Sequence, residues 1–229
     1  MVDIVQQNFS PEINTHIVNL TRLNLNASYI YQAYASYFER ADVSLPGFEG
    51  FFDHQSLEKK EHANILIKYI NARGGHAQFS QLDLVTVCNL AWSQSKDDSS
   101  SLHDPEQGMC ICNFVATGEA NKNCAPNKNR KNWYEGRMAL VDALVVERYI
   151  NKELQELHKA ATRKKDADLA HYLEHYLMGD LIQDIYQLAQ HVTRLRLFAL
   201  KGGKNYKLGE YILDQELQSS VSGEAAARV

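Results

Sequence analysis

The 229-residue chain lacks several features that would place it in common functional classes. Its net charge is −4, so it lacks the basic excess of a nucleic-acid-binding protein. It has no apolar run long enough to span a bilayer. The opening residues, MVDIVQQNFS, contain neither the basic start nor the apolar core of a signal peptide, which is compatible with a mature form whose signal was removed. We expect neither nucleic acid nor a membrane as a partner.

Cysteine is absent from most of the chain, and its 4 occurrences, Cys88, Cys110, Cys112 and Cys124, all fall in one central stretch. That stretch, residues 76–132, is rich in Ser, Asn and Lys and shows little helical periodicity. We interpret it as an insertion between helices.

Four long segments outside this insertion have apolar residues at steps of three and four, which predicts helices. The first is expected to begin at a Ser10-Pro11 cap and the second to end at Gly74-Gly75; the third begins near Trp133 and the fourth ends before Gly202. The apolar stripes include Ile13, Ile17 and Leu20, then Phe48, Phe52 and Leu66, then Leu140, Leu144 and Leu154, and finally Leu181, Ile185 and Leu188.

The order of links favours one all-α domain over residues 1–229. The first and second helices, and the third and fourth, have short links, whereas the long link lies between the second and third. This is the ferritin-like four-helix bundle with one long crossover, although periodicity alone also allows an unrelated up-down bundle. A short fifth helix is expected around Leu208, Ile212 and Glu216, followed by a mobile tail at about 218–229.

Polar residues interrupt the stripes at matching depth: Asn24, Lys59, His62 and Glu147, with Tyr31 nearby. Burying such groups is costly unless they pair or bind something. Inward carboxylates and Glu-x-x-His pairs are the ligands of di-iron bundles. Here the pair is Lys59-x-x-His62, and a charged ammonium cannot bind a metal but can take its place beside Glu147. The alternatives are a satisfied core histidine and a carboxylate that only balances Lys59.

Glu58 and Glu61 flank this stripe at a spacing that brings both acids onto one face. Hard cations prefer such oxygen clusters. A solvated acidic face without a ligand explains the spacing equally well.

Several segments of the chain closely resemble animal ferritins: NASYIYQAYASYFERADVSLPGF, FFDHQSLEKKEHANILIKYINARGG, NKELQELHKAA and QHVTRL. The resemblance covers nearly everything except the insertion and the tail. It implies a shell of 24 subunits around an iron mineral, built from one kind of subunit or mixed with a ferroxidase-active one. Within the family, the large insertion resembles the secreted yolk ferritins of molluscs.

The resemblance also implies roles for individual residues. Tyr31, His62 and Glu147 match the ferroxidase centre of heavy chains, as a remnant. Asn24, Lys59 and Leu181 stand where that centre has two glutamates and a glutamine, with Asp180 beside the last, so we expect little or no ferroxidase activity. Glu58 and Glu61 match mineral-nucleating acids of light chains, and the metal ligands that survive are expected to be Glu58, Glu61, His62 and Glu147. The three-fold iron channel maps to His158, His171 and Glu174.

The cysteines bear on the compartment. Cys88 and Cys124 can each pair with one of Cys110 and Cys112, in either order, which implies a secreted or yolk-granule protein. A zinc site and four free thiols in a cytoplasmic protein are the alternatives.

The expected function is iron storage with iron as cargo. The alternatives are an active ferroxidase that uses Tyr31, His62, Glu147 and Asp180, and a yolk nutrient or carrier shell that contains little iron.

Overall fold

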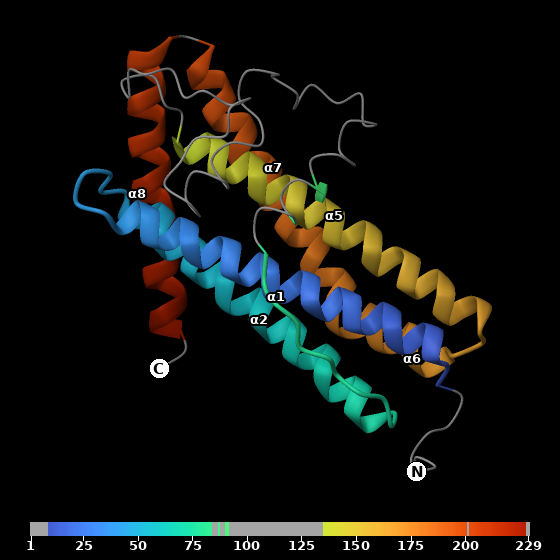
Figure 1. The fold of residues 1–229 in the computed structure, drawn as a ribbon. Coiled ribbons are helices and arrows are strands. Elements are labelled where there is room, and N and C mark those ends of the chain that lie inside the picture. Colours follow the sequence, from blue (N-terminus) through green and yellow to red (C-terminus); the bar gives the residue numbers. More distant parts are fainter. Residues whose placement is uncertain (1–8, 84–86, 88–89, 92–134, 201, 228–229) are drawn as a thin grey trace.

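The computed structural model describes residues 9–83, 87, 90–91, 135–200 and 202–227 (Figure 1). Their regular secondary structure is helical throughout, and none of the helices in this part of the chain is long and apolar enough to cross a membrane. The helices are α1 (Pro11–Glu39), α2 (Pro46–Ala72), α5 (Glu135–Arg163), α6 (Ala167–Leu173), the π-helical turn η2 (Glu174–Met178), α7 (Gly179–Ala199) and α8 (Gly203–Ala227).

Four rods form the bundle: α1, α2, α5, and the continuous rod of α6, η2 and α7 (Figure 1). Helices α1 and α2 lie side by side in opposite directions, and α5 runs parallel to α2, so the connection between α2 and α5 must cross the length of the bundle. This confirms the predicted four-helix bundle with one long crossover.

The helix ends follow local signals in the sequence. Ser10 Oγ accepts a hydrogen bond from the Ile13 N–H at 3.3 Å and caps α1, as predicted. Gly74, with φ of 75°, follows the end of α2, and Gly202, with φ of 94°, follows α7. Both glycines adopt the left-handed conformation that stops a helix with little strain, so both predicted stops are confirmed.

The fourth rod is longer than the stripe that predicted it. It starts at Ala167, where the Asp166 carboxylate accepts a hydrogen bond from the Leu169 N–H at 3.1 Å, and it contains the π turn η2 before α7 begins. A π turn holds one extra residue, which shifts the apolar register. The periodicity therefore identified only the part of this rod that follows the shift.

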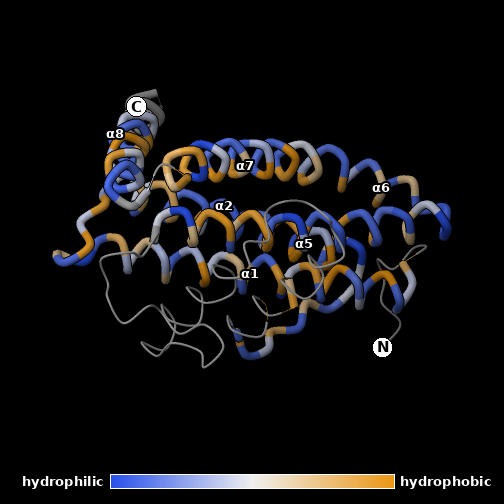
Figure 2. The backbone as a smooth tube through the Cα atoms, turned by 90° about the horizontal axis from the view of Figure 1, so that it is seen from above, coloured by the Kyte–Doolittle hydropathy of each residue, from blue (hydrophilic) through white to orange (hydrophobic). Residues whose placement is uncertain are grey.

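Helix α8 lies across one end of the bundle (Figures 1 and 2). The Asp214 carboxylate accepts hydrogen bonds from the backbone N–H groups of Gly47 at 2.8 Å and Phe48 at 3.1 Å, so it caps α2, which has no capping side chain of its own. A Cβ on Gly47 would lie 1.8 Å from the Asp214 carbonyl oxygen, which explains the glycine.

The fifth helix differs from its prediction in length and in buried face. It spans 25 residues and continues to Ala227, into the tail that we predicted to be mobile from about residue 218. The glutamate and three alanines at its end, residues 224–227, favour helix. The side chains that pack on the bundle include Tyr206, Leu213 and Leu217, whereas Leu208, Ile212 and Glu216 remain exposed.

The chain after α2 returns along the bundle. The Asp83 N–H donates to Asn26 Oδ1 on α1 at 2.6 Å, and Val87 and Ala91 are buried against the core. The remainder of the predicted insertion, including Cys88, Cys110, Cys112 and Cys124, lies outside the described residues.

Candidate metal centre

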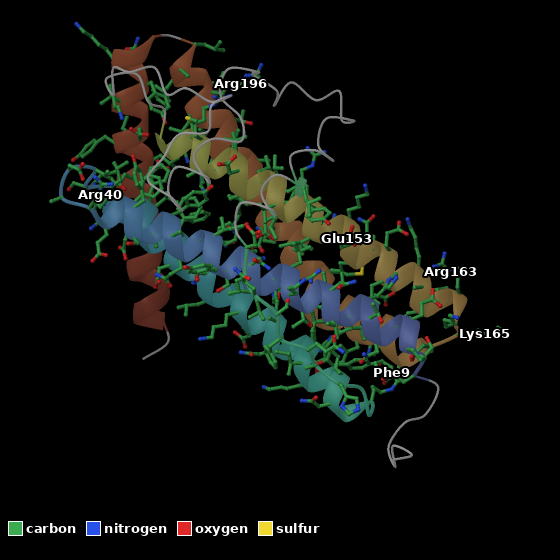
Figure 3. All side chains as sticks on the ribbon, in the orientation of Figure 1. Phe9, Arg40, Glu153, Arg163, Lys165 and Arg196 are labelled. Atoms are coloured by element: carbon green, nitrogen blue, oxygen red, sulfur yellow. The ribbon has the colours of Figure 1, made fainter. Side chains whose placement is uncertain are left out.

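A cluster of polar residues inside the bundle draws on all four rods, and all of its members except Asp184 were predicted from the sequence. Tyr31 lies on α1, Lys59 and His62 on α2, Glu147 on α5, and Asp184 on α7. All five are buried, with exposed fractions between 0% and 7%. Arg163 and Lys165, by contrast, are exposed at the end of the bundle (Figure 3).

Lys59 is at the centre of this cluster. Its Nζ lies 2.6 Å from Asp184 Oδ2, 3.0 Å from Glu147 Oε2 and 3.5 Å from Glu58 Oε1, and its side chain has no exposed surface. The pairing with Glu147 that the sequence indicated is therefore present. The shorter contact to Asp184 was not predicted.

The surroundings keep this lysine charged. Burial alone would lower its pKa, but Glu147, Asp184 and Glu58 together raise the Lys59 pKa above its ordinary value. Burial also raises the pKa of Glu147, and the neighbouring Lys59 ammonium opposes that shift. At neutral pH an ammonium thus sits between carboxylates in a part of the bundle that is closed to the surface.

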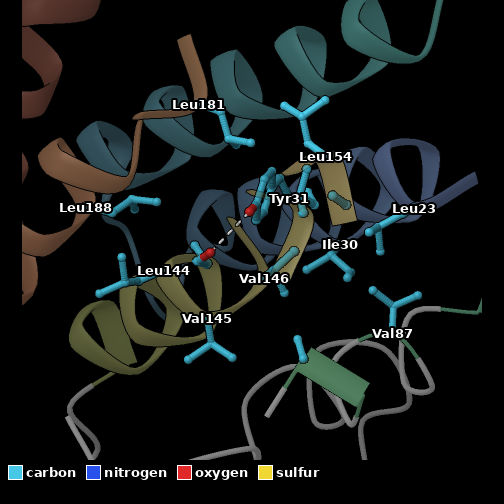
Figure 4. Close-up of a cluster of buried hydrophobic side chains, with 14 of the residues drawn as sticks. Leu23, Ile30, Tyr31, Val87, Leu144, Val145, Val146, Leu154, Leu181 and Leu188 are labelled. Atoms are coloured by element: carbon cyan, nitrogen blue, oxygen red, sulfur yellow. Dashed lines mark hydrogen bonds between the residues drawn. The ribbon is translucent and has the colours of Figure 1, made fainter. Parts of the chain in front are cut away.

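Tyr31 completes the contacts of Glu147. Its hydroxyl donates to Glu147 Oε1 at 2.6 Å, and it also lies 3.4 Å from the Ala143 carbonyl oxygen. Burial, followed by the charge of Glu147, raises the pKa of Tyr31, so the phenol keeps its proton and acts as a donor. Figure 4 shows this ring among apolar side chains that include Leu144 and Leu181.

His62 lies beside the ammonium and is neutral. Burial, and then the charge of Lys59, lower the pKa of His62 to about 4. Its Nε2 is 3.8 Å from Glu58 Oε1 and 3.7 Å from Asp180 Oδ2, distances too long for hydrogen bonds. Burial raises the pKa of Glu58 to about 8, against the opposing effect of Lys59.

Two of the predicted positions do not join the cluster. Asn24 donates from Nδ2 to the Leu20 carbonyl oxygen of its own helix at 2.9 Å, and its buried Oδ1 accepts no hydrogen bond within the described chain. Leu181 is packed in the apolar core with 2% exposure. Asp180, the alternative to Leu181, has a side chain that is 68% exposed.

These residues do not fit a pair of iron ions. The Lys59 ammonium, which has no lone pair, stands between Glu147 and Asp184 where a cation would need their oxygens. Asn24 supplies only an amide oxygen in place of a carboxylate. Across the part of the chain that the structure describes, no group of three or more His, Cys, Asp or Glu residues is arranged to hold a metal ion.

Asp184 is the site residue that the sequence reading missed. We placed Ile185 on the apolar stripe of the fourth helix, whereas the structure buries Asp184 and leaves Ile185 only partly buried. Asp184 follows Leu181 by three residues and precedes Leu188 by four, so it occupies a core-facing position. A charged residue at a core-facing position was the signal in the sequence that could have identified Asp184 as a site residue.

The remaining predicted residues lie at the surface. Glu61 is exposed and Glu58 is partly buried. His158 Nε2 and Glu174 Oε1 are 2.7 Å apart, which joins α5 to η2. The His171 ring packs on His175 instead.

Comparisons with known proteins match this fold and sequence. A family model described as a ferritin-like domain matches residues 14–198. The chain is 45% identical over 213 residues to a yolk ferritin of Lymnaea stagnalis, covering 93% of this chain and 88% of that protein. It is 33% identical over 221 residues to a soma ferritin of the same snail, covering 96% and 99%.

Proposed function

Because this chain belongs to the ferritin family, we propose that it stores iron as a subunit of a 24-subunit shell and has no ferroxidase centre of its own. Iron is its cargo. The proposed lack of a ferroxidase centre rests on the position of the Lys59 Nζ, which lies 2.6 Å from Asp184 and 3.0 Å from Glu147. The ammonium occupies the space between these carboxylates and offsets one of their two negative charges, which reduces their attraction for a ferrous ion.

Storage without this centre requires acids elsewhere. Glu58 and Glu61 are the candidates for nucleating mineral, because they lie on the same face of α2 and only Glu58 contacts the lysine. His158, His171 and Glu174 are the candidates for lining an entry channel between subunits. The contact between His158 and Glu174 supports this proposal, because it brings two of the three candidate residues together.

The compartment proposed is a secreted or yolk-granule one. It is supported by the likeness to a relative named yolk ferritin and by four cysteines in a single stretch that can form two disulfides. Mass mapping of the cysteines without reduction tests this part, because four free thiols would contradict it.

Anaerobic loading with two Fe(II) per chain, followed by oxygen, tests the proposed loss of ferroxidase activity. We expect slow formation of ferric species with no rapid phase. The double variant Asn24→Glu with Lys59→Glu should introduce a rapid phase at least tenfold faster, because it returns glutamates to the two positions where the heavy-chain centre has them. Lys60→Glu, which makes the same charge change at the exposed neighbour, is the control and should behave as the unmodified chain.

A rapid phase in the unmodified protein would contradict the proposal and favour an altered ferroxidase built on Tyr31, His62, Glu147 and Asp180. A native shell that contains almost no iron would instead favour a nutrient or carrier role.

A further inference from the structure

Three tyrosine rings form a continuous stack from the core to the surface. Tyr69 on α2 packs on Tyr172 of α6, with 4.4 Å between the ring centroids, and Tyr172 packs on Tyr176 of η2 at 4.6 Å. Both separations are at the short end of those that aromatic pairs adopt. Tyr69 is 5% exposed and Tyr176 is 45% exposed, so these three residues, the tyrosine stack, connect a buried phenol with solvent.

The inner end of the tyrosine stack has an acceptor for the phenol proton. Burial raises the pKa of Tyr69, so its phenol is protonated at neutral pH and must release the proton when it is oxidised. Its hydroxyl donates a hydrogen bond to Asp168 Oδ2 at 3.0 Å, and a carboxylate at that distance can take the proton as the electron leaves. The Asp168 side chain is 74% exposed, so it can pass the proton on to water.

The other rings of the stack lack such an acceptor. The Tyr172 hydroxyl donates to the Ile65 carbonyl oxygen on α2 at 3.1 Å. A backbone amide oxygen is a far weaker base than a carboxylate, so it does not take the proton of an oxidised phenol. Tyr176 meets solvent, and water is also a weaker base than a carboxylate. An electron vacancy formed on either ring therefore moves inward to Tyr69.

Two other buried tyrosines donate to carboxylates but have no comparable connection to the surface. Tyr31 and Tyr34 are 0% and 1% exposed, and each donates to a buried acid. Both rings pack on Phe52, a ring that has no hydroxyl proton to release and is much harder to oxidise than a phenol. An oxidant in solution therefore reaches Tyr69 more readily.

We propose that the tyrosine stack is a site of one-electron oxidation, in which a hydroxyl radical in solution takes an electron through Tyr176 and Tyr172 from Tyr69. The Tyr69 O–H bond breaks, its proton goes to Asp168, and a neutral phenoxyl radical remains on the ring. The electron reduces the hydroxyl radical to hydroxide, which the released proton converts to water. The stack thus intercepts radicals at the surface, and it uses no residue of the candidate metal centre.

Pulse radiolysis of the assembled full-length protein with azide radicals tests this proposal, because an azide radical removes one electron from tyrosine without a metal ion. Transient absorption and electron paramagnetic resonance of freeze-quenched samples follow the tyrosyl radical. We expect a long-lived fraction of this signal in the unmodified protein and a loss of that fraction, at least fivefold, in Tyr69→Phe. Tyr186→Phe, which removes an exposed tyrosine outside the stack, is the control and should retain it.

A second pair of variants tests the proton acceptor. Asp168→Asn should shorten the lifetime of the radical at least fivefold, because an amide does not take the phenol proton. Asp42→Asn is the matched control, since Asp42 is another exposed aspartate paired with an arginine, and it should leave the lifetime unchanged. Circular dichroism checks that each variant keeps its helix content.

Three results would overturn the proposal. A long-lived signal that persists in Tyr69→Phe would assign the radical to another tyrosine, such as Tyr31. An equal loss in Tyr186→Phe would mean that exposure alone decides which tyrosine is oxidised. An unchanged lifetime in Asp168→Asn would remove the proposed route of the proton. None of these results bears on iron storage, which the Fe(II) loading experiment tests separately.

Discussion

Two clusters in this molecule each place one cation in contact with acidic side chains, but they lie in different surroundings. In the middle of the bundle Lys59 contacts Glu147 and Asp184, and the lysine has no exposed surface. At the end of α2 the Arg73 guanidinium contacts Asp166 at 2.9 Å and Asp168 at 3.1 Å. Asp168 has a side chain that is 74% exposed.

The comparison shows that burial decides what a cation does. Arg73 joins two parts of the fold, the end of α2 and the start of the fourth rod, with a planar group that forms paired hydrogen bonds. Lys59 joins three rods, and its charge also offsets part of the negative charge of the buried acids Glu147 and Asp184. The Arg73 cluster ties two parts of the fold together, whereas the Lys59 cluster places an ammonium among the acids of the candidate metal centre.

The largest effect is expected from Lys59→Met, which leaves two buried carboxylates without a cation. We expect the free energy of unfolding to fall by about 3–5 kcal/mol, measured by guanidinium titration. Lys60→Met, at the exposed neighbour, is the matched control and should change it by less than about 0.5 kcal/mol. Equal effects of the two changes would mean that the buried cluster is solvated.

Asp184→Asn should cost about 2–3 kcal/mol, because Lys59 loses its shortest charged partner in a dry site. The control is Asp180→Asn, whose side chain is 68% exposed and which should leave stability almost unchanged. Guanidinium titration of both variants measures this difference in the free energy of unfolding. A larger loss from Asp180→Asn would show that the sequence-based alternative identified the important acid.

The pH dependence of the free energy of unfolding tests whether the His62 imidazole is buried and neutral. Its folded pKa of about 4 is below the ordinary value of 6.5, so its contribution to stability is present above pH 6.5 and is lost as pH falls toward 4. Between pH 7 and pH 5 the unmodified chain should lose about 2 kcal/mol more than His62→Gln. His76→Gln, at an exposed histidine, should follow the unmodified chain. Parallel pH profiles for all three proteins would contradict a buried neutral imidazole.

Arg73→Lys should give the smallest effect, about 1 kcal/mol, because lysine keeps the charge but cannot form the paired bonds to Asp166. Arg163→Lys, at an exposed arginine, is the control for the loss of a guanidinium. If Arg73→Lys cost as much as Lys59→Met, the distinction between the two clusters would fail.

Much of the fold was predictable because its signals are local. The Ser10 cap, the glycine stops and the long crossover follow from residues within one helical turn of each boundary and from the lengths of the links. The extra length of the fourth rod was not predictable from periodicity, because the π turn at Glu174–Met178 shifts the register. The fifth helix was expected, but the spacing of its apolar residues did not show which face of the helix packs on the bundle.

The amino-acid sequence by itself determined that a lysine replaces a carboxylate beside His62, that Tyr31 and Glu147 survive, and that the chain is a ferritin. Those conclusions need only residue types, helical spacing and motif likeness. Only the tertiary structure decided which acid pairs with Lys59, because Asp184 is 125 residues away along the chain and reaches the lysine only when the bundle assembles. The same packing leaves Asp180 at the rim and Leu181 in the core. The distance between charged atoms and their burial set the electrostatics of a site, and both arise only when helices from distant parts of a chain come together.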